Sequence, residues 1–522
     1  MKHAVSLMIL CLLGIFTYAQ APTIQWQKSI GGSNSEAANS IIQTTDGGYI
    51  IAGYSFSNDG DVSGHHGDST TSDCWIAKLN SVGAIQWEQS YGGAGNEVAT
   101  SIIQTSDGGY IFTGLSDSTS DEVTGNHGGY DIWVVKIDSV GNMQWEQSYG
   151  GSSDEGGVTI AQTTDGGYII GGNTTSNNGD ITFNHGDGDY WLVKISSTGA
   201  IQWQNTYGGS YNDWGYYAIQ TGDGGYMIGG ISESIDGEVT GNHGSVDYWV
   251  VKTDTAGNLQ WEQSYGGAGY DRLGSIIQTT DGGYFMTGLS DSTSDEVTGN
   301  HGSYDFWVVK IFANGSIQWE QSYGGTNYDA AGISVQTSDG GYIVSGVSSS
   351  VNDEVTGHHG DTSTTDYWVI KMDTLGNIQW KQSYGGSDND QLYSIIQTTD
   401  GGYTMAGSSF SNDGDVTGHH DDSTTSDCWI VKINEYATGI NTVIGQANAH
   451  IYPNPTSDKF VLEVSSNFIG GQYKLTDITG REIITGKIQN EISQYSLTDL
   501  SAGLYVLEIN NSNKQVFKIV KQ

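Results

Sequence analysis

Short apolar runs separated by glycine-rich turns recur along most of the chain. Ser40–Ser55 reads SIIQTTDGGYIIAGYS, in which two apolar runs flank an Asp-Gly-Gly turn. Glycine accepts the positive φ that a tight turn requires, so this stretch predicts a β-hairpin. A longer loop of Ser, Asp and Gly follows. A run such as DYWVVKID then alternates as a strand does, and IQWEQSYGG predicts a fourth strand after one more turn.

This four-strand pattern occurs seven times with a period of 58 or 61 residues. We number the repeats one to seven by the aspartate of their DGGY turns: Asp46, Asp107, Asp165, Asp223, Asp281, Asp339 and Asp400. Each repeat also has one tryptophan after a glutamine and a second in the pattern D-x-W. The repetition predicts an all-β protein with a seven-bladed β-propeller over residues 20–434. The alternative, a linear β-solenoid, has shorter coils and needs caps.

The two ends of the repeat region indicate a closed ring. The chain begins with a lone fourth strand at Ile24–Ile30, and repeat seven stops at Ile433 without one. We therefore expect the first strand to complete the last blade, which leaves no blade with an open edge.

The repeat resembles known propeller families. The pattern K-x-D-x-x-G-x-x-x-W, as in KIDSVGNMQW, resembles the tryptophan-docking repeats of quinoprotein-like propellers. The whole unit, over roughly residues 23–434, is similar to the GGY propeller repeats of exported bacterial proteins. These resemblances imply a fold and no single activity.

Composition adds a charge asymmetry and excludes some partners. The 522 residues include 18 basic and 59 acidic side chains, a net charge of −41. Residues 20–449 hold 10 basic and 52 acidic side chains, whereas residues 450–522 hold seven of each. Nucleic acid and a bare anionic membrane are excluded as expected partners, because both need a basic face. The asymmetry marks a domain boundary near residue 449.

The first 19 residues are typical of a secretory signal peptide. Lys2 is followed by a mostly apolar run, and cleavage is expected between Ala19 and Gln20. A membrane anchor is the alternative, but the run is short for a span, and no later segment is apolar enough to form a transmembrane segment. Lipidation at Cys11 is disfavoured because Leu10 precedes it. Cys74 and Cys428 alone do not make a disulfide framework.

The alternating apolar pattern of residues 450–522 predicts about seven short strands, which would form a small Ig-like β-sandwich. This segment resembles the type A C-terminal sorting domain of the type IX secretion system of Gram-negative bacteria. The motif residues that carry the resemblance are Tyr452, Pro453, Asn454, Pro455, Gly480, Arg481, Gly503, Leu504 and Tyr505. The resemblance implies the type IX secretion machinery as a partner, and release or attachment at the cell surface. Residues 435–449 are expected to form the linker.

Acidic residues recur at four positions in every repeat, and a histidine recurs at a fifth. One interpretation is seven metal or catalytic sites. Because a single active site needs one copy of its residues, we favour a structural network, with an Asp–His–Ser/Thr–Trp relay in each repeat. Calcium remains an alternative in the acidic loops, with the weak ligand candidates Asp59, Asp61, Asp413 and Asp415.

Departures from the repeat are better candidates for function. Repeats one, six and seven have a loop three residues longer, with the paired histidines His65, His66, His358, His359, His419 and His420. These repeats are neighbours in a closed ring, so imidazole and carboxylate groups there could hold zinc. Recent duplication of one blade type, with solvated loops, is the simpler explanation. Trp214 replaces a small or aliphatic residue in repeat four and could stack on a sugar ring or add packing.

The sequence favours an exported, non-catalytic binding or adhesion module for a glycan or a protein. The alternatives are a polysaccharide-acting enzyme, such as a glycoside hydrolase, and a structural surface-layer component. No hydrolase, zinc-protease, P-loop or dinucleotide motif is present, so no catalytic residue is assigned. No cofactor is expected, apart from possible calcium.

Overall fold

The computed structural model describes residues 21–420, 424–434, 449–452, 456, 458–464, 468–477, 481–498, 500–501, 503–510 and 514–521. The predicted signal peptide with its cleavage site at Ala19 and Gln20, and the predicted linker apart from Ala449, lie outside these residues. The chain divides into two compact units, Met1–Tyr436 and Ala437–Gln522. The described part of both units is built of strands and contains no α-helix.

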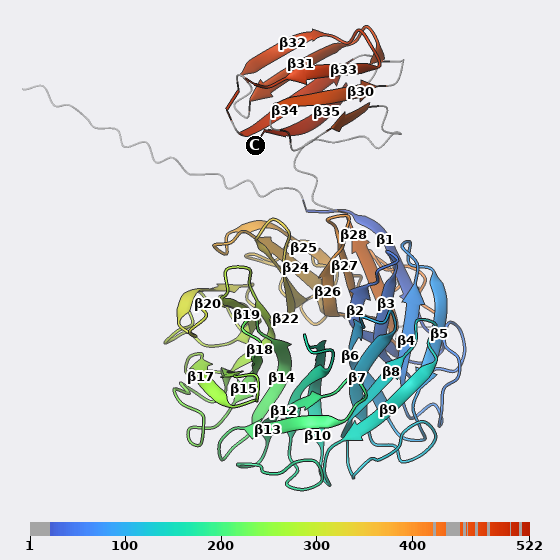
Figure 1. The fold of residues 1–522 in the computed structure, drawn as a ribbon, viewed down its shortest axis with the longest axis vertical. Helices are drawn as coiled ribbons and strands as arrows, with labels where there is room; N and C mark the ends of the chain where they lie inside the picture. Colours follow the sequence, from blue (N-terminus) through green and yellow to red (C-terminus); the bar gives the residue numbers. More distant parts are fainter. Residues whose placement is uncertain are drawn as a thin grey trace, which may run out of the picture. The chain divides into compact units, whose positions relative to one another are not determined.

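The first unit contains seven four-stranded antiparallel sheets, which follow one another around a ring (Figure 1). Each sheet corresponds to one sequence repeat. The first strands are β2 (Glu36–Gln43), β6 (Glu97–Gln104), β10 (Glu155–Gln162), β14 (Asp213–Gln220), β18 (Asp271–Gln278), β22 (Asp329–Gln336) and β26 (Asp390–Gln397). The second strands are β3 (Tyr49–Ser55), β7 (Tyr110–Ser116), β11 (Tyr168–Thr174), β15 (Tyr226–Ser232), β19 (Tyr284–Ser290), β23 (Tyr342–Ser348) and β27 (Tyr403–Ser409).

The third strands carry the D-x-W tryptophans, and their residues are buried throughout. They are β4 (Asp73–Leu79), β8 (Asp131–Ile137), β12 (Asp189–Ile195), β16 (Asp247–Thr253), β20 (Asp305–Ile311), β24 (Asp366–Met372) and β28 (Asp427–Ile433). The fourth strands are β5 (Ile85–Tyr91), β9 (Met143–Tyr149), β13 (Ile201–Tyr207), β17 (Leu259–Tyr265), β21 (Ile317–Tyr323), β25 (Ile378–Tyr384) and, for repeat seven, β1 (Ile24–Ile30).

The ring closes through the first strand of the chain. β1 pairs antiparallel with β28, with Ile30 opposite Cys428 and Lys28 opposite Ile430. The first strands of neighbouring repeats also contact one another around the whole ring, including β2 with β26. Across the closure, the backbone N–H of Thr399 donates to Gln43 Oε1 at 2.8 Å. The fold is therefore an all-β propeller.

Apolar clusters fill the space between neighbouring sheets. One cluster combines Ile76 of β4 with Ile102 of β6 and Trp133 of β8, all of them buried. Burying a large side chain stabilises the fold by about 1.5–3 kcal/mol, so two tryptophans in each repeat have a structural use without a ligand.

The Q-W tryptophans pack on the following repeat. A Cβ on Gly141 would lie 3.2 Å from the Trp87 ring, and Gly141 adopts a φ of 90°. Glycine is required there both for the turn and for the approach of the indole. Gly141 is the glycine of the K-x-D-x-x-G-x-x-x-W pattern in KIDSVGNMQW, so this contact gives the pattern a structural reason.

Each first strand begins earlier than the apolar run in its sequence predicts. β2 starts at Glu36 rather than at Ser40, and its register with β3 shifts between Ala38 and Ser40. Similar register shifts interrupt the first strands of all seven sheets. A bulge adds one unpaired residue to a strand and redirects its side chain. The alternation is broken at that point, which is why the sequence pattern conceals the start of the strand.

The second unit is a small β-sandwich, as predicted. A three-stranded sheet contains β29 (Ala449–Tyr452), β30 (Lys459–Val464) and β33 (Ile492–Ser496). A four-stranded sheet contains β31 (Gln472–Asp477), β32 (Glu482–Lys487), β34 (Gly503–Asn510) and β35 (Lys514–Lys521). Phe460, Leu475 and Leu507 are among the residues of its buried core.

Membrane-spanning helices were sought throughout the described residues. None of the segments there forms a helix of the length and apolarity that crossing a bilayer requires.

Candidate functional site

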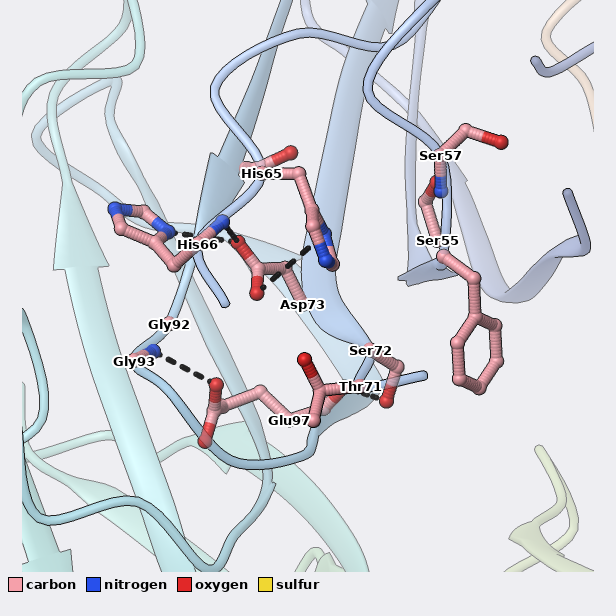
Figure 2. A network of polar contacts seen from close by, with 12 residues as sticks. Ser55, Ser57, His65, His66, Thr71, Ser72, Asp73, Gly92, Gly93 and Glu97 are labelled. Carbon is pink, nitrogen blue, oxygen red and sulfur yellow. Dashed lines mark hydrogen bonds and ion pairs between the residues drawn. The ribbon is translucent and has the colours of Figure 1, made fainter. Parts of the chain in front are cut away.

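A histidine–aspartate pair lies at the same place in every repeat. In repeat one, His66 Nδ1 lies 2.7 Å from Asp73 Oδ2, and the His66 backbone N–H donates to the same oxygen at 2.8 Å (Figure 2). The other six repeats have the same pair at 2.5 to 2.9 Å. The aspartate is fully buried, so the pair anchors the long loop to the start of the third strand.

A second buried carboxyl group lies close to each of these aspartates and comes from the following repeat. Glu97 accepts from the Gly93 N–H at 2.8 Å (Figure 2). It also accepts from the Ser116 hydroxyl at 2.6 Å. A Cβ on Gly92 would lie 2.4 Å from Glu97 Oε2 and 3.0 Å from Asp73 Oδ1. The aspartate Oδ1 has no hydrogen-bond partner in any of the seven repeats. Two carboxyl groups therefore meet at each boundary between repeats.

Burial favours the neutral form of these second carboxyl groups. Desolvation raises the pKa of Glu36 to about 7 and that of Asp390 to about 7. It raises the pKa of the equivalent Asp213, Asp271 and Asp329 to about 6, and it raises the pKa of Glu97 and Glu155 as well. Because every copy is shifted in the same direction, the shift is a property of the fold.

Of the predicted Asp–His–Ser/Thr–Trp relay, the described residues show the Asp–His pair, and the tryptophan member is wrong. The indole N–H of Trp75 donates to Glu88 of β5 at 3.1 Å and contacts neither the histidine nor the aspartate. A Glu or Gln thirteen residues after the tryptophan accepts this bond in repeats one to five, and Gln27 of β1 accepts it in repeat seven. Repeat six has Lys381 at that position, and the Trp368 indole N–H has no hydrogen-bond partner.

The DGGY aspartates belong to a separate network, which sequence reasoning missed. Each pairs with the lysine of the third strand at 2.9 to 3.0 Å, as Asp46 does with Lys78. The lysine side chains are only 2 to 5% exposed. A hydrogen bond from Thr44, together with Lys78, lowers the pKa of Asp46 to about 2. The signal was available, because lysine and aspartate both recur seven times at fixed spacing.

The paired histidines divide into two roles. The second of each pair, His66, His359 and His420, is the anchor present in every repeat. The first of each pair has a nearly buried side chain and bonds a carbonyl oxygen of its own loop: His65 with Asp68, His358 with Asp361 and His419 with Thr425, at 2.9 to 3.1 Å. These contacts hold the longer loops in place. Ligand binding by the pairs stays a prediction.

The calcium candidates have protein partners. Asp59 and Asp413 accept the backbone N–H groups of Ser33 and Ser387, each at 2.7 Å. Asp61 lies 3.4 Å from His420 Nε2, and Asp415 lies 3.8 Å from His359 Nε2. A group of three or more His, Cys, Asp or Glu side chains arranged for a metal ion is absent from the described part of the chain. Cys74 and Cys428 are buried and form no disulfide with each other.

Trp214 is the one tryptophan of the chain outside the two repeated series. It is 41% exposed and lies next to the buried start of β14. A Cβ on Gly188 would lie 3.1 Å from its Nε1 atom, so the indole covers backbone of repeat three. Trp214 therefore combines packing with an exposed aromatic face.

The first strands of all seven repeats line a central cavity of about 610 Å³. Its wall contains hydroxyl and amide groups, including Ser40, Thr100 and Gln391. Its aromatic residues are Tyr216, Tyr217, Tyr328 and Tyr393, and Arg272 is the one cation among the described residues that line it. Asp, Glu and His are absent from the described residues that line it. Sequence reasoning missed this site, although all five of these side chains break the repeat.

The structure describes five of the nine motif residues of the sorting segment. Arg481 Nε, next to the start of β32, donates to Asp477 Oδ2 at the end of β31, at 2.9 Å. Gly503 and Leu504 begin β34, and Tyr505 is buried with its hydroxyl donating to the Ser501 carbonyl at 2.8 Å. Tyr452 ends β29. Pro453, Asn454, Pro455 and Gly480 lie outside the described residues.

Comparison with known families identifies this segment. Residues 450–522 match the model of the secretion system C-terminal sorting domain. The chain is thus sorted by the type IX secretion system and exported to the cell surface or the extracellular space. Comparison with the curated proteins gives no match.

Solved structures give distant similarities. The Pan2 WD40 domain of Neurospora crassa has a TM-score of 0.45 at 10% identity, covering 81% of this chain and 99% of that one. BamB of Moraxella catarrhalis has a TM-score of 0.33 at 12% identity, covering 79% of this chain and all of that one. PorZ of Porphyromonas gingivalis, a surface component of the type IX secretion system, has a TM-score of 0.20 at 9% identity, covering 95% and 100%. At these values the similarities say nothing of function.

Proposed function

We propose that this exported propeller is a non-catalytic module that binds a saccharide in its central cavity. The module acts at the cell surface or outside the cell, where its sorting domain sends it. Aromatic rings and hydroxyl or amide groups, the side chains that complement a sugar ring, line the cavity together with aliphatic side chains.

The observation that carries the proposal is the lack of carboxyl groups in the described wall of this cavity. The chain has 59 acidic residues, yet none of the described residues that line the cavity is acidic. This composition argues against acid–base catalysis in the cavity. A glycoside hydrolase of the usual kind needs two carboxyl groups about 5–10 Å apart on either side of the bond it cleaves. The cavity offers surfaces for binding and no such pair.

The recurrent carboxyl groups support the same proposal. The aspartate of each D-x-W motif holds a histidine, and the DGGY aspartate holds a lysine. The acid at the start of the first strand accepts hydroxyl and backbone N–H groups, as Glu97 does. Their contacts explain why they recur in all seven repeats, and they assign these groups to the scaffold.

The test combines retention with a search for hydrolysis. Residues 20–522 are immobilised and exposed to a panel of polysaccharides and short glycans, and the eluates are assayed for new reducing ends. We expect specific retention of at least one glycan without release of reducing sugar. Release of reducing ends would contradict the non-catalytic role. Retention of no glycan, with capture of a purified surface protein instead, would contradict the saccharide assignment.

A further inference from the structure

The sevenfold repetition fails at the wall of the central cavity. At the second residue of the first strand, repeat five has Arg272 where repeats one, two and six have Ala37, Val98 and Ala330. At the bulge residue, repeats four and seven have Tyr216 and Tyr393, whereas repeats five and six have Gly274 and Gly332. These exceptions face one cavity.

Arg272 is unusual in its charge and in its surroundings. It is the only arginine between residues 20 and 434, and seven of the other nine basic residues there are the buried lysines bound to the DGGY aspartates. Its side chain is exposed, and its Cζ atom lies 5.3 Å from the centre of the Tyr216 ring. Among the described residues, Arg272 takes part in none of the ion pairs. The guanidinium group also forms a hydrogen bond with Tyr216. Its five N–H donors exceed what that bond uses, and their planar fork matches the geometry of a carboxylate.

Two tyrosine rings outside the cavity lining support Tyr328. Tyr328 lines the cavity and is 39% exposed. The Tyr304 ring lies edge-on to it, with the two centres 5.8 Å apart, and Tyr270 meets Tyr304 in the same way at 6.1 Å. Rings that support one another lose little conformational freedom when a ligand stacks on them, and their hydroxyl groups donate and accept hydrogen bonds.

The cavity that Arg272 lines has space for a ligand. A Cβ added to Gly332 would find no atom closer than 3.8 Å. The cavity volume of about 610 Å³ lies within the range of about 300–1,000 Å³ typical of small-ligand sites. One or two sugar rings fit that size.

We propose that the cavity binds a saccharide that carries a carboxylate, with the Arg272 guanidinium holding the carboxylate and the Tyr216 and Tyr328 rings contacting the sugar. This inference rests on the proposed saccharide-binding function and adds the chemical class of the ligand. The 52 acidic side chains of residues 20–449 repel a long polyanion. The carboxylate therefore belongs to a short or terminal sugar unit, and Arg272 supplies the local positive charge.

The test compares two uronic acid glycosides with neutral glycosides that differ from them only in the carboxylate, and N-acetylneuraminic acid is added as a third acidic sugar. Residues 20–522 are titrated with the methyl glycosides of glucuronic and galacturonic acid, with N-acetylneuraminic acid, and with methyl glucoside and methyl galactoside, and binding is followed by saturation-transfer NMR. We expect at least one acidic sugar to bind on the order of tenfold or more tightly than its neutral counterpart, because charge-assisted hydrogen bonds are the strong ones. Arg272→Gln should abolish that difference.

Two further variants separate the site from folding and from general charge effects. Gly332→Tyr introduces the residue that repeats four and seven carry at this position, so it should fill the cavity and weaken binding without touching Arg272. Lys28→Gln removes one exposed positive charge outside the cavity and should change nothing. Thermal melts establish that each variant is folded.

Three results would overturn the inference. Equal binding of acidic and neutral sugars, unchanged by Arg272→Gln, would refute the carboxylate assignment and leave the saccharide-binding function standing. Equal weakening by Lys28→Gln and Arg272→Gln would show a general charge effect and would refute the site. Failure of every saccharide in both this titration and the glycan panel would refute the proposed function together with the inference.

Discussion

At the scale of single residues, most of the charge in this propeller stabilises its own fold. The buried Lys136 ammonium group illustrates the point, because it bonds Asp107, the Ile137 carbonyl and Gln144 at 3.0 to 3.2 Å. The aspartate is 57% exposed, so solvent screens the ion pair. Gln144 is exposed as well, so the buried bond to the Ile137 carbonyl depends most strongly on the lysine.

Replacing Lys136 with methionine keeps its volume and removes these bonds. We expect Lys136→Met to lower the free energy of unfolding by about 1–3 kcal/mol, since it removes the donor that the buried Ile137 carbonyl accepts from. Urea unfolding followed by tryptophan fluorescence measures the loss. The exposed Lys28→Met variant is the matched control, with an expected change within about 0.5 kcal/mol. Equal effects of the two substitutions would contradict the structural role of the buried lysine.

The same scale shows what sequence could and could not predict about the site. Seven copies of His and Asp indicated a structural network, and the His66–Asp73 pair is part of one. The partner of the Trp75 indole was assigned incorrectly, because the acceptor Glu88 lies on another strand and only the strand register brings it close. Arg272 was overlooked because nothing in a linear pattern indicates that the second residue of a first strand faces the cavity.

At the scale of the strands, the repeat made the architecture predictable. Apolar runs around the DGGY turns indicated the first two strands, and the missing fourth strand of repeat seven pointed to β1. The bulge in each first strand was not predictable, because its extra residue breaks the alternation of side chains between the two faces of the strand. That bulge is what positions Tyr216, Gly332 and Tyr393 against the cavity.

Removal of β1 tests the pairing that closes the ring. A chain that begins at residue 32 exposes the edge of β28 and the apolar cluster that Ile30 helps to cover. We expect it to associate into oligomers and to melt at a lower temperature, because open edges recruit other strands. Light scattering after size exclusion and a circular-dichroism melt measure both effects.

A synthetic peptide of residues 21–31 provides the control for this truncation. Adding it should restore the monomer and the melting temperature, whereas a scrambled peptide should not. A monomeric truncated chain with the original melting temperature would show that β1 contributes nothing to the ring.

At the scale of the whole molecule, buried acids should set the pH at which the fold is most stable. The pKa of Glu36 is about 7 against an ordinary 4.5, so its contribution is fully present below about pH 4.5 and is lost as the pH rises through 7. Asp390 and the raised pKa values of His66 and His420 act in the same direction. The pKa of Asp46 is about 2, so its contribution is lost only as the pH falls from about 3.8 through 2.

We therefore predict a melting temperature that is several degrees higher at pH 5 than at pH 8. Differential scanning calorimetry at both pH values gives the difference. Repeating the scans in 1 M NaCl is the control, because salt screens the general repulsion of 59 acidic residues and screens a buried pair much less. A melting temperature that is equal or higher at pH 8 in both salts would contradict the raised pKa values.

The central claim is that the sevenfold repeat is the scaffold and that its exceptions around the cavity bind the ligand. The most direct measurement is a crystal structure of residues 20–522 with the best-retained saccharide bound. We predict density for the sugar inside the central cavity, against Tyr216 and Tyr328 and within hydrogen-bond distance of Arg272. A sugar bound instead on the long loops of repeats one, six and seven, beside the paired histidines, would contradict this account.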